Sequence, residues 1–217
     1  GFTTDQMSAF LNTQMSGFGT AQIAALSTDQ VDALSTSQLA ALRAAQFRSL
    51  TTTQISALLT DQVRGLTNGA LAALSTDQAR AFTTDQVQAF TTHQISSLGT
   101  GTVAALTTDQ LGALTTDQVV ALTKPAIHAL TTSQLLGLST GQIAAIETVD
   151  LAGMTSEQLN ALATDQVAAF TTAQVAALTA IQVSQLDVDQ IAAFRTDHIA
   201  AMSSRQLKSL TGDQMAA

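Results

Sequence analysis

Few side chains in this sequence could do chemistry, and the carboxylates are the most regular of them. Aspartates recur at multiples of eight residues, at Asp29, Asp61, Asp77, Asp85, Asp109, Asp117 and Asp165. Such hard oxygen ligands suit calcium, but a calcium site needs roughly six to eight converging oxygen atoms. One carboxylate in each repeat does not ensure that convergence. We therefore predict no metal site and interpret the aspartates as first-turn residues of short helices.

The three histidines, His93, His128 and His198, fall at three different places in the repeat and share no common face. His198 stands where most repeats have Gln, so we interpret it as a substitute hydrogen-bond donor. Cysteine is absent, which excludes thiolate sites and disulfides. No serine lies in a nucleophile-elbow context, and no glycine-rich phosphate loop is present. We predict no enzyme activity, no catalytic or cofactor-binding residue, and no cofactor.

All of these residues are set in one repeating unit of eight residues. From Thr3 onward the chain divides, without insertion or deletion, into 26 complete octads and a final one of seven residues. We number the octad positions 1 to 8, as in TTDQVVAL at 115–122. We predict one continuous array over residues 1–217. Because neither end has the atypical polar repeat that closes most solenoids, we expect a segment of a longer array or one that polymerises end to end.

The side chains at positions 5 and 8 should form the core. Position 5 is apolar in every octad, and position 8 is apolar in every complete one. Position 7 is Ala, Gly or Ser except at Gln185, which predicts that a neighbouring backbone approaches closely there. Position 6 varies from Asp32 and Arg64 to Gln88 and Lys208, so it should face water.

Positions 1 to 4 predict the start of a helix. Thr or Ser at position 1 with Gln at position 4 forms a capping box, in which the hydroxyl accepts from the N3 amide and the Gln side chain reaches back to the N-cap amide. Gln occupies position 4 in 22 of the 27 octads. Asp at position 3 would lie in the first turn, where the helix dipole favours negative charge. Eight residues advance a helix by about 800°, so an apolar stripe would drift about 80° per octad, and the helix must break in every octad.

The fold class we predict is all-α, a solenoid or superhelix of short capped helices with one helix per octad. A β-solenoid is the competing interpretation, but Ala and Gln are poor strand residues and the apolar positions do not alternate with period two. Since all octads look equivalent, we expect each coil to contain three or four of them, with small position 7 residues letting coils nest.

Composition limits the classes of partner. With 46% apolar and 11% charged residues, the chain should be ordered. Every octad interrupts its apolar residues with polar ones, so we expect no membrane span. A net charge of -8 with only eight basic residues offers nucleic acid no phosphate-neutralising surface. We therefore expect no nucleic-acid partner.

Threonines at position 2, such as Thr84, Thr108 and Thr116, suggest a further interpretation. Position 1 hydroxyls are used in capping, but position 2 hydroxyls remain free. Regularly spaced hydroxyls on a flat solenoid face can match an ice lattice or another crystalline surface.

Two resemblances bear on function. The stretch LTTDQVVAL at 114–122 is similar to the opening helix of TAL effector repeats, but the second helix and the base-reading loop of that family are missing, so its DNA function does not carry over. The whole chain resembles the octapeptide TTxQ[VI]xAL arrays of very large bacterial secreted and surface proteins of the adhesin kind. This second resemblance implies an extracellular or cell-surface location.

Our leading hypothesis is a structural module that acts as a stalk, filament or spacer of a bacterial surface protein or fibre, with self-association end to end or side by side. The alternative is a ligand-binding solenoid that uses the variable positions 3 and 6 to bind a protein, glycan, mineral or ice surface. The strongest local irregularity lies in 123–154, and it comprises Lys124, Pro125, His128, Glu147, Val149 and Asp150.

Overall fold

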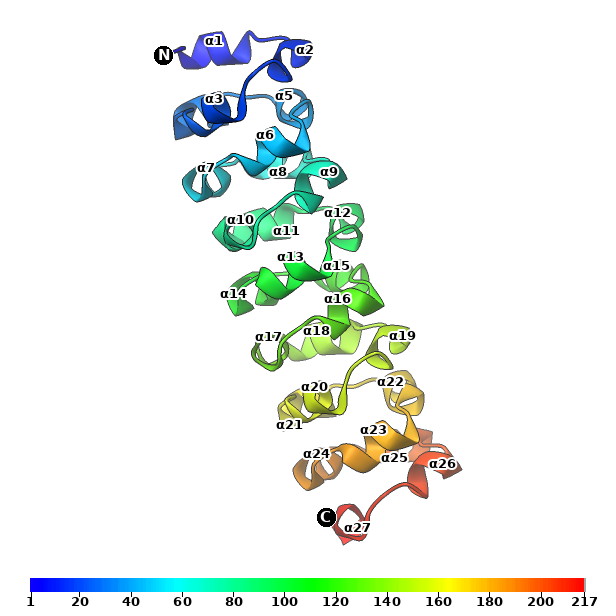
Figure 1. The fold of residues 1–217 in the computed structure, drawn as a ribbon. Helices are drawn as coiled ribbons and strands as arrows, with labels where there is room; N and C mark the ends of the chain where they lie inside the picture. Colours follow the sequence, from blue (N-terminus) through cyan, green and yellow to red (C-terminus); the bar gives the residue numbers. More distant parts are fainter. Residues whose placement is uncertain (217) are drawn as a thin grey trace. The chain divides into compact units, whose positions relative to one another are not determined.

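The computed structural model describes residues 1–216, and every element in that range is a short α-helix, one per octad (Figure 1). The all-α fold predicted from the sequence is thereby confirmed. The chain divides into two compact units, Gly1–Leu114 (unit 1) and Thr115–Ala217 (unit 2), and each is described by itself. No helix in the described residues is long and apolar enough to cross a membrane.

The helices of unit 1 are α1 (Thr4–Ser8), α2 (Asn12–Met15), α3 (Thr20–Ala24), α4 (Thr28–Asp32), α5 (Thr36–Ala40), α6 (Ala44–Arg48), α7 (Thr52–Ser56), α8 (Thr60–Arg64), α9 (Asn68–Ala72), α10 (Thr76–Ala81), α11 (Thr84–Ala89), α12 (Thr92–Ser96), α13 (Thr100–Ala105) and α14 (Thr108–Gly112). The helices of unit 2 are α15 (Thr116–Val120), α16 (Lys124–His128), α17 (Thr132–Leu136), α18 (Thr140–Ala145), α19 (Thr148–Leu151), α20 (Ser156–Asn160), α21 (Thr164–Ala168), α22 (Thr172–Ala177), α23 (Ala180–Gln185), α24 (Val188–Ala192), α25 (Thr196–Ala201), α26 (Ser204–Leu207) and α27 (Gly212–Ala216).

Each helix ends because the residues at positions 8 and 1 leave the helical conformation. Phe82 has φ −62° and ψ 138°, and the following N-cap residue, Thr83, has φ −73° and ψ 163°. Both values are extended conformations that any L-residue adopts. Among the described residues none has a positive φ and no peptide bond is cis. The corner between two helices therefore needs neither a glycine nor a special proline.

Within each unit a helix packs against the third helix after it. In unit 1, α7 packs against α10 and α10 against α13; in unit 2, α16 packs against α19 and α22 against α25. Hydrogen bonds between coils join residues 25 to 31 positions apart. These separations lie between three and four octads, in agreement with the coil size expected from the sequence.

Positions 5 and 8 form the core, as predicted. Position 5 is at most 1% exposed throughout unit 1, from Met7 to Leu111, and position 8 is buried in most octads of both units. The exceptions at position 5 are Ile199, Leu207 and Met215, whose exposures are 43%, 43% and 69%. These three belong to the last octads, which no later coil covers. Position 5 side chains are therefore covered by the coil that follows them.

Position 7 is small because a side chain of the preceding coil lies against it. A Cβ atom built on Gly65 would lie 2.8 Å from Cβ of Thr36, and one built on Gly153 would lie 2.7 Å from Cε of Lys124. In both cases the neighbour is at position 2, 29 residues earlier. The predicted close approach is present, but at these glycines the approaching group is a side chain and not the backbone we expected. At Gln185, the large exception at position 7, the position 2 residue 29 earlier is Ser156, whose hydroxyl bonds the Gln185 side chain.

Adding bulk at position 7 should therefore destabilise the contact with position 2 specifically. We expect Gly65→Val to lower the free energy of unfolding by about 1 to 3 kcal/mol through overpacking. Thr36→Gly removes both colliding atoms, Cβ and Cγ2, and should recover part of that loss in the double variant. Urea denaturation of the parent, both single variants and the double variant measures the coupling; additive effects would show that the two positions are independent.

Candidate functional site

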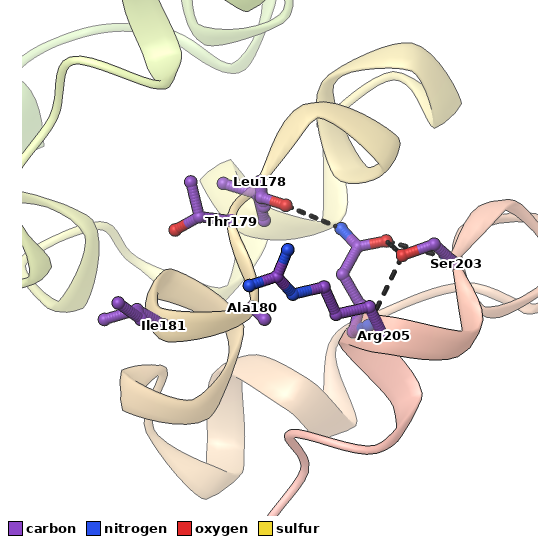
Figure 2. Close-up of a pocket in the computed structure, with 7 residues that line it drawn as sticks. Leu178, Thr179, Ala180, Ile181, Ser203 and Arg205 are labelled. Carbon is purple, nitrogen blue, oxygen red and sulfur yellow. Dashed lines mark hydrogen bonds between the residues drawn. The ribbon is translucent and has the colours of Figure 1, made fainter.

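The Gln side chain at position 4 closes the N-terminus of its own helix, as the capping box predicts. At α26 the backbone N–H of Ser203 donates to Oε1 of Gln206 at 2.7 Å, and the N–H of Gln206 donates to the Ser203 hydroxyl at 3.3 Å (Figure 2). The same reciprocal pair recurs at most octads that have Thr or Ser at position 1. Each of these helices thus begins with two of its free N–H groups paired.

The other half of the same amide bonds the preceding coil. Nε2 of Gln206 donates to the carbonyl oxygens of Val175 and Leu178, both at 2.8 Å, and Figure 2 shows the bond to Leu178. Nε2 of Gln86 in unit 1 donates in the same way to Ile55 at 3.0 Å and Leu58 at 2.6 Å. The acceptors lie 31 and 28 residues earlier, at positions 5 and 8 of the fourth preceding octad. We call this set of bonds between coils the glutamine ladder.

The glutamine ladder satisfies backbone groups that short helices leave unpaired. A helix has free N–H groups in its first turn and free carbonyl groups in its last. Leaving such a group buried without a partner costs about 1 to 3 kcal/mol. One Gln amide pairs an N–H of its own helix and carbonyls at the C-terminus of another. The ladder Gln residues are 1–6% exposed from Gln38 onward, whereas Gln14 in the first coil is exposed.

Sequence reasoning found the capping half of this residue and missed the half that joins coils. A signal was present, because Gln also occupies position 4 in octads whose position 1 residue cannot cap. Gln62 follows Leu59 and Gln166 follows Ala163, and neither N-cap side chain accepts a hydrogen bond. Both Gln side chains nevertheless donate to the preceding coil, to Val31 at 3.0 Å and to Leu135 at 2.9 Å. A residue retained without its capping partner has a second role.

Two arginines add bonds between coils, and one histidine replaces the ladder Gln. The guanidinium groups of Arg43 and Arg195, at position 1, donate to the carbonyls of Ser16 and Ala168 in the preceding coil. Arg195 also pairs with Asp197 at 3.1 Å, and this hydrogen bond lowers the pKa of the Asp197 carboxyl.

His198 takes the Gln position and is fully buried. Its Nδ1 accepts from the N–H of Arg195 at 3.3 Å, and its Nε2 lies 2.7 Å from the Phe170 carbonyl. Since a carbonyl can only accept, Nε2 carries the proton. His198 therefore acts as a hydrogen-bond donor in place of Gln, as the sequence predicted.

Four other octads lack a side chain that can complete the ladder. Their position 4 residues are Ala70, Thr102, Ala126 and Asp150. At Thr102 a hollow of about 330 Å³ opens beside Leu74, and Leu74 is half-buried where most residues at position 8 are buried. The octad with Thr102 in place of Gln thus leaves part of the apolar Leu74 side chain exposed.

Hollows of similar construction recur between coils. One wall is the corner that joins two octads, and the other is the start of the octad that packs against it from the next coil. The hollow in Figure 2 has a volume of about 380 Å³ and includes Ile181 and Arg205, both at position 3. Another, of about 320 Å³, includes His128 at position 6 and Glu157 at position 3. The variable positions therefore give each hollow its own chemistry.

The side chains that the sequence marked as chemically capable do not gather into one centre. His93 lies 3.2 Å from Asn68, His128 lines the hollow with Glu157, and His198 is buried in the ladder. Within residues 1–216 no three side chains of His, Cys, Asp or Glu are placed to hold a metal ion. Most of the position 3 aspartates lie in the first turn of their helices and are exposed.

Two ends of the irregular segment 123–154 lie next to each other. Helix α16 packs against α19, and the Lys124 side chain lies against Gly153. Asp150 is 5% exposed, and burial and the nearby Glu147 raise the pKa of its carboxyl, while Lys124 opposes that rise. Val149 is 61% exposed.

The repeating corner, the glutamine ladder and the absence of strands in the described residues define a solenoid of single short α-helices. A family model described as the ALTTAQ repeat matches residues 12–44, 36–68, 60–92, 67–100, 92–124 and 143–180. These segments cover more than half of the chain, which therefore belongs to the ALTTAQ repeat family. No curated protein matches the chain.

The ladder makes a direct prediction about stability. Gln174→Met keeps the side-chain length but removes bonds to Ile143 at 2.9 Å and Ile146 at 2.8 Å, so we expect a loss of at least about 1 to 3 kcal/mol in the free energy of unfolding. Gln14→Met is the matched control, because Gln14 bonds only the N–H of Leu11. Chemical denaturation compares the two, and equal losses would contradict the ladder.

Proposed function

We propose that this chain is a non-enzymatic structural module, a stalk, filament or spacer of a bacterial surface protein or fibre. The observation that carries this proposal is that the bonds between coils run from Gln side chains to backbone carbonyls. Backbone carbonyls are the same in every octad, whatever occupies positions 2, 3 and 6. Octads can therefore be added or removed without redesigning the contacts, which is what a spacer of variable length requires.

An extracellular or cell-surface location is part of the proposal. The chain has no cysteine, so its folding does not depend on the redox state of its surroundings. It also resembles octapeptide arrays of large bacterial secreted and surface proteins. Few charges and an apolar, hydrogen-bonded interior suit a passive scaffold.

Association between copies would follow from the polarity of a coil. One side of a coil presents Gln donors, such as Gln14 and Gln22, and the other side presents carbonyl acceptors and position 5 side chains such as Met215. Any coil added in the same direction, by the same chain or by a second copy, meets the same groups. This favours end-to-end over side-by-side contact.

The proposal is tested by lengthening the array. A second copy of residues 155–194, five octads that all carry Gln at position 4, is inserted after Phe194. We expect the cross-sectional radius from small-angle X-ray scattering and the mean residue ellipticity to stay constant while the longest dimension increases. The control inserts residues 155–191, which puts the following octads out of register and should lower ellipticity and the melting temperature. A larger cross-section in the first variant would contradict a spacer.

Ligand binding by the hollows is the second candidate, and the observation that favours it is their variable lining. His128 faces the same hollow as Glu157, whereas Ile181 and Arg205 line another. Such differences give each hollow a different preference for a protein, glycan, mineral or ice surface.

A glycan array and an ice-recrystallisation assay test this candidate directly. Binding through the hollow lined by His128 and Glu157 should be lost in the double variant His128→Ala, Glu157→Ala. It should be kept in His93→Ala, because His93 does not line that hollow. If neither assay detects the parent protein, or if both variants retain binding, these hollows are not the recognition surface for those ligands.

A further inference from the structure

Asp150 occupies a place where every ladder octad has a hydrogen-bond donor. It is the position 4 residue of the octad at 147–154, and the fourth preceding octad is that of α15. By the ladder rule, the acceptors that a Gln here would meet are the carbonyls of Val119, Val120 and Leu122. We call these three carbonyls together with the Asp150 side chain the Asp150 slot.

The Asp150 slot contains acceptors and no donor at neutral pH. A carboxylate can only accept hydrogen bonds, and so can a backbone carbonyl. Helix α19 has no capping box, and within the described residues the Asp150 carboxylate has no hydrogen-bond partner. Nor do the carbonyls of Val120 and Leu122 have a side-chain donor there. The residue as a whole is only 5% exposed, so the carboxylate is hydrated less fully than the exposed first-turn aspartates.

When the Asp150 carboxyl takes up a proton, the slot gains one hydrogen-bond donor beside its three carbonyl acceptors. A protonated carboxyl carries an O–H that can donate to a carbonyl, as the Gln Nε2 does in the other octads. We propose that the Asp150 slot is a pH-sensitive joint between coils of unit 2, strengthened when the Asp150 carboxyl is protonated and weakened when it ionises.

The surrounding charges are few and act in the expected directions. Burial and the neighbouring Glu147 raise the pKa of Asp150, and Lys124 of α16 opposes them. Helix α16 also carries His128, the octad of α15 carries Asp117, and α22 carries no charged residue. A raised pKa in the folded chain means that protonation favours folding. The stabilisation is therefore complete below the unfolded pKa and is lost as the pH rises through the folded one.

The experiment compares Asp150→Asn and Asp150→Gln with the parent protein at two pH values. Asn has the shape of the protonated carboxyl and keeps a donor at every pH, and Gln rebuilds the full ladder contact. At pH 7.5 both variants should melt above the parent, by on the order of 2 to 4 °C. At pH 3.5 the advantage of Asn should largely disappear, because the parent then carries its own donor. All other carboxyl groups are common to the three proteins and cancel in the differences.

A local measurement makes the result specific to this joint. After correction for intrinsic rates, hydrogen exchange of peptides covering 115–122 and 147–154 should be faster in the parent than in Asp150→Asn at pH 7.5, and nearly equal in the two proteins at pH 3.5. Lys124→Met keeps the stem against Gly153 but removes the ammonium, and it should enlarge the pH dependence. The control is Asp189→Asn, which removes an exposed first-turn carboxyl from α24, where Gln190 completes the ladder; it should not stabilise at pH 7.5.

Two outcomes would overturn the proposal. If the advantage of Asp150→Asn is the same at both pH values, protonation of Asp150 is not linked to the joint. If Asp150→Asn and Asp150→Gln both melt below the parent at pH 7.5, the carboxylate itself stabilises the contact. Neither outcome bears on the spacer proposal, which is tested by lengthening the array.

Discussion

The fold depends on a single side-chain amide that bonds in two directions. Helices of four to six residues have more unpaired backbone groups than paired ones, and alone they would not persist in water. The Gln at position 4 pairs an N–H at the start of its own helix and carbonyls at the end of a helix about one coil earlier, as Gln174 does with Thr171, Ile143 and Ile146. The apolar residues at positions 5 and 8 hold the coils together. The Gln amide pairs the backbone groups at the helix ends, so these ends can be buried between coils without unpaired polar groups.

Much of this architecture could be predicted from the sequence because it repeats locally. The apolar positions, the capping box and the break in every octad all lie within eight residues, and the structure confirms each of them. What could not be predicted depends on residues 25 to 31 positions away. The partners of Gln86 at Ile55 and Leu58, and the packing of Thr36 on Gly65, have no local signature. For the same reason the neighbour at position 7 was expected to be backbone. The one available clue was Gln retained after residues such as Leu59 and Ala163, which cannot cap.

The ladder also determines which octad positions can change residue type without disturbing the contacts between coils. Positions 3 and 6 vary because their side chains take no part in the glutamine ladder. Only individual residues there, such as Ser8, Arg80 and His93, bond another coil, so variation changes the surface without changing the ladder. Variation at position 4 has a different meaning. His198 keeps both halves of the Gln role with its two ring nitrogens, whereas at Thr102 no ladder amide reaches Leu74, which stays half-buried. Asp150 is the one substitution at this position that puts a charge-bearing acceptor where a donor is needed. The chain therefore carries its most unusual electrostatics inside the stack and not on its variable surface.

Burial at position 5 gives the array a direction of assembly. The position 5 side chains of the first coil, Met7, Met15 and Ile23, are fully covered, while those of the last octads are not. A chain made from its N-terminus always has its incomplete side at the end being synthesised, with carbonyls and apolar side chains already in place for the next coil. Each new set of Gln amides thus meets a template that has already folded. Growth in the opposite direction would present donors before their acceptors existed, so synthesis from the N-terminus matches the order in which these bonds can form.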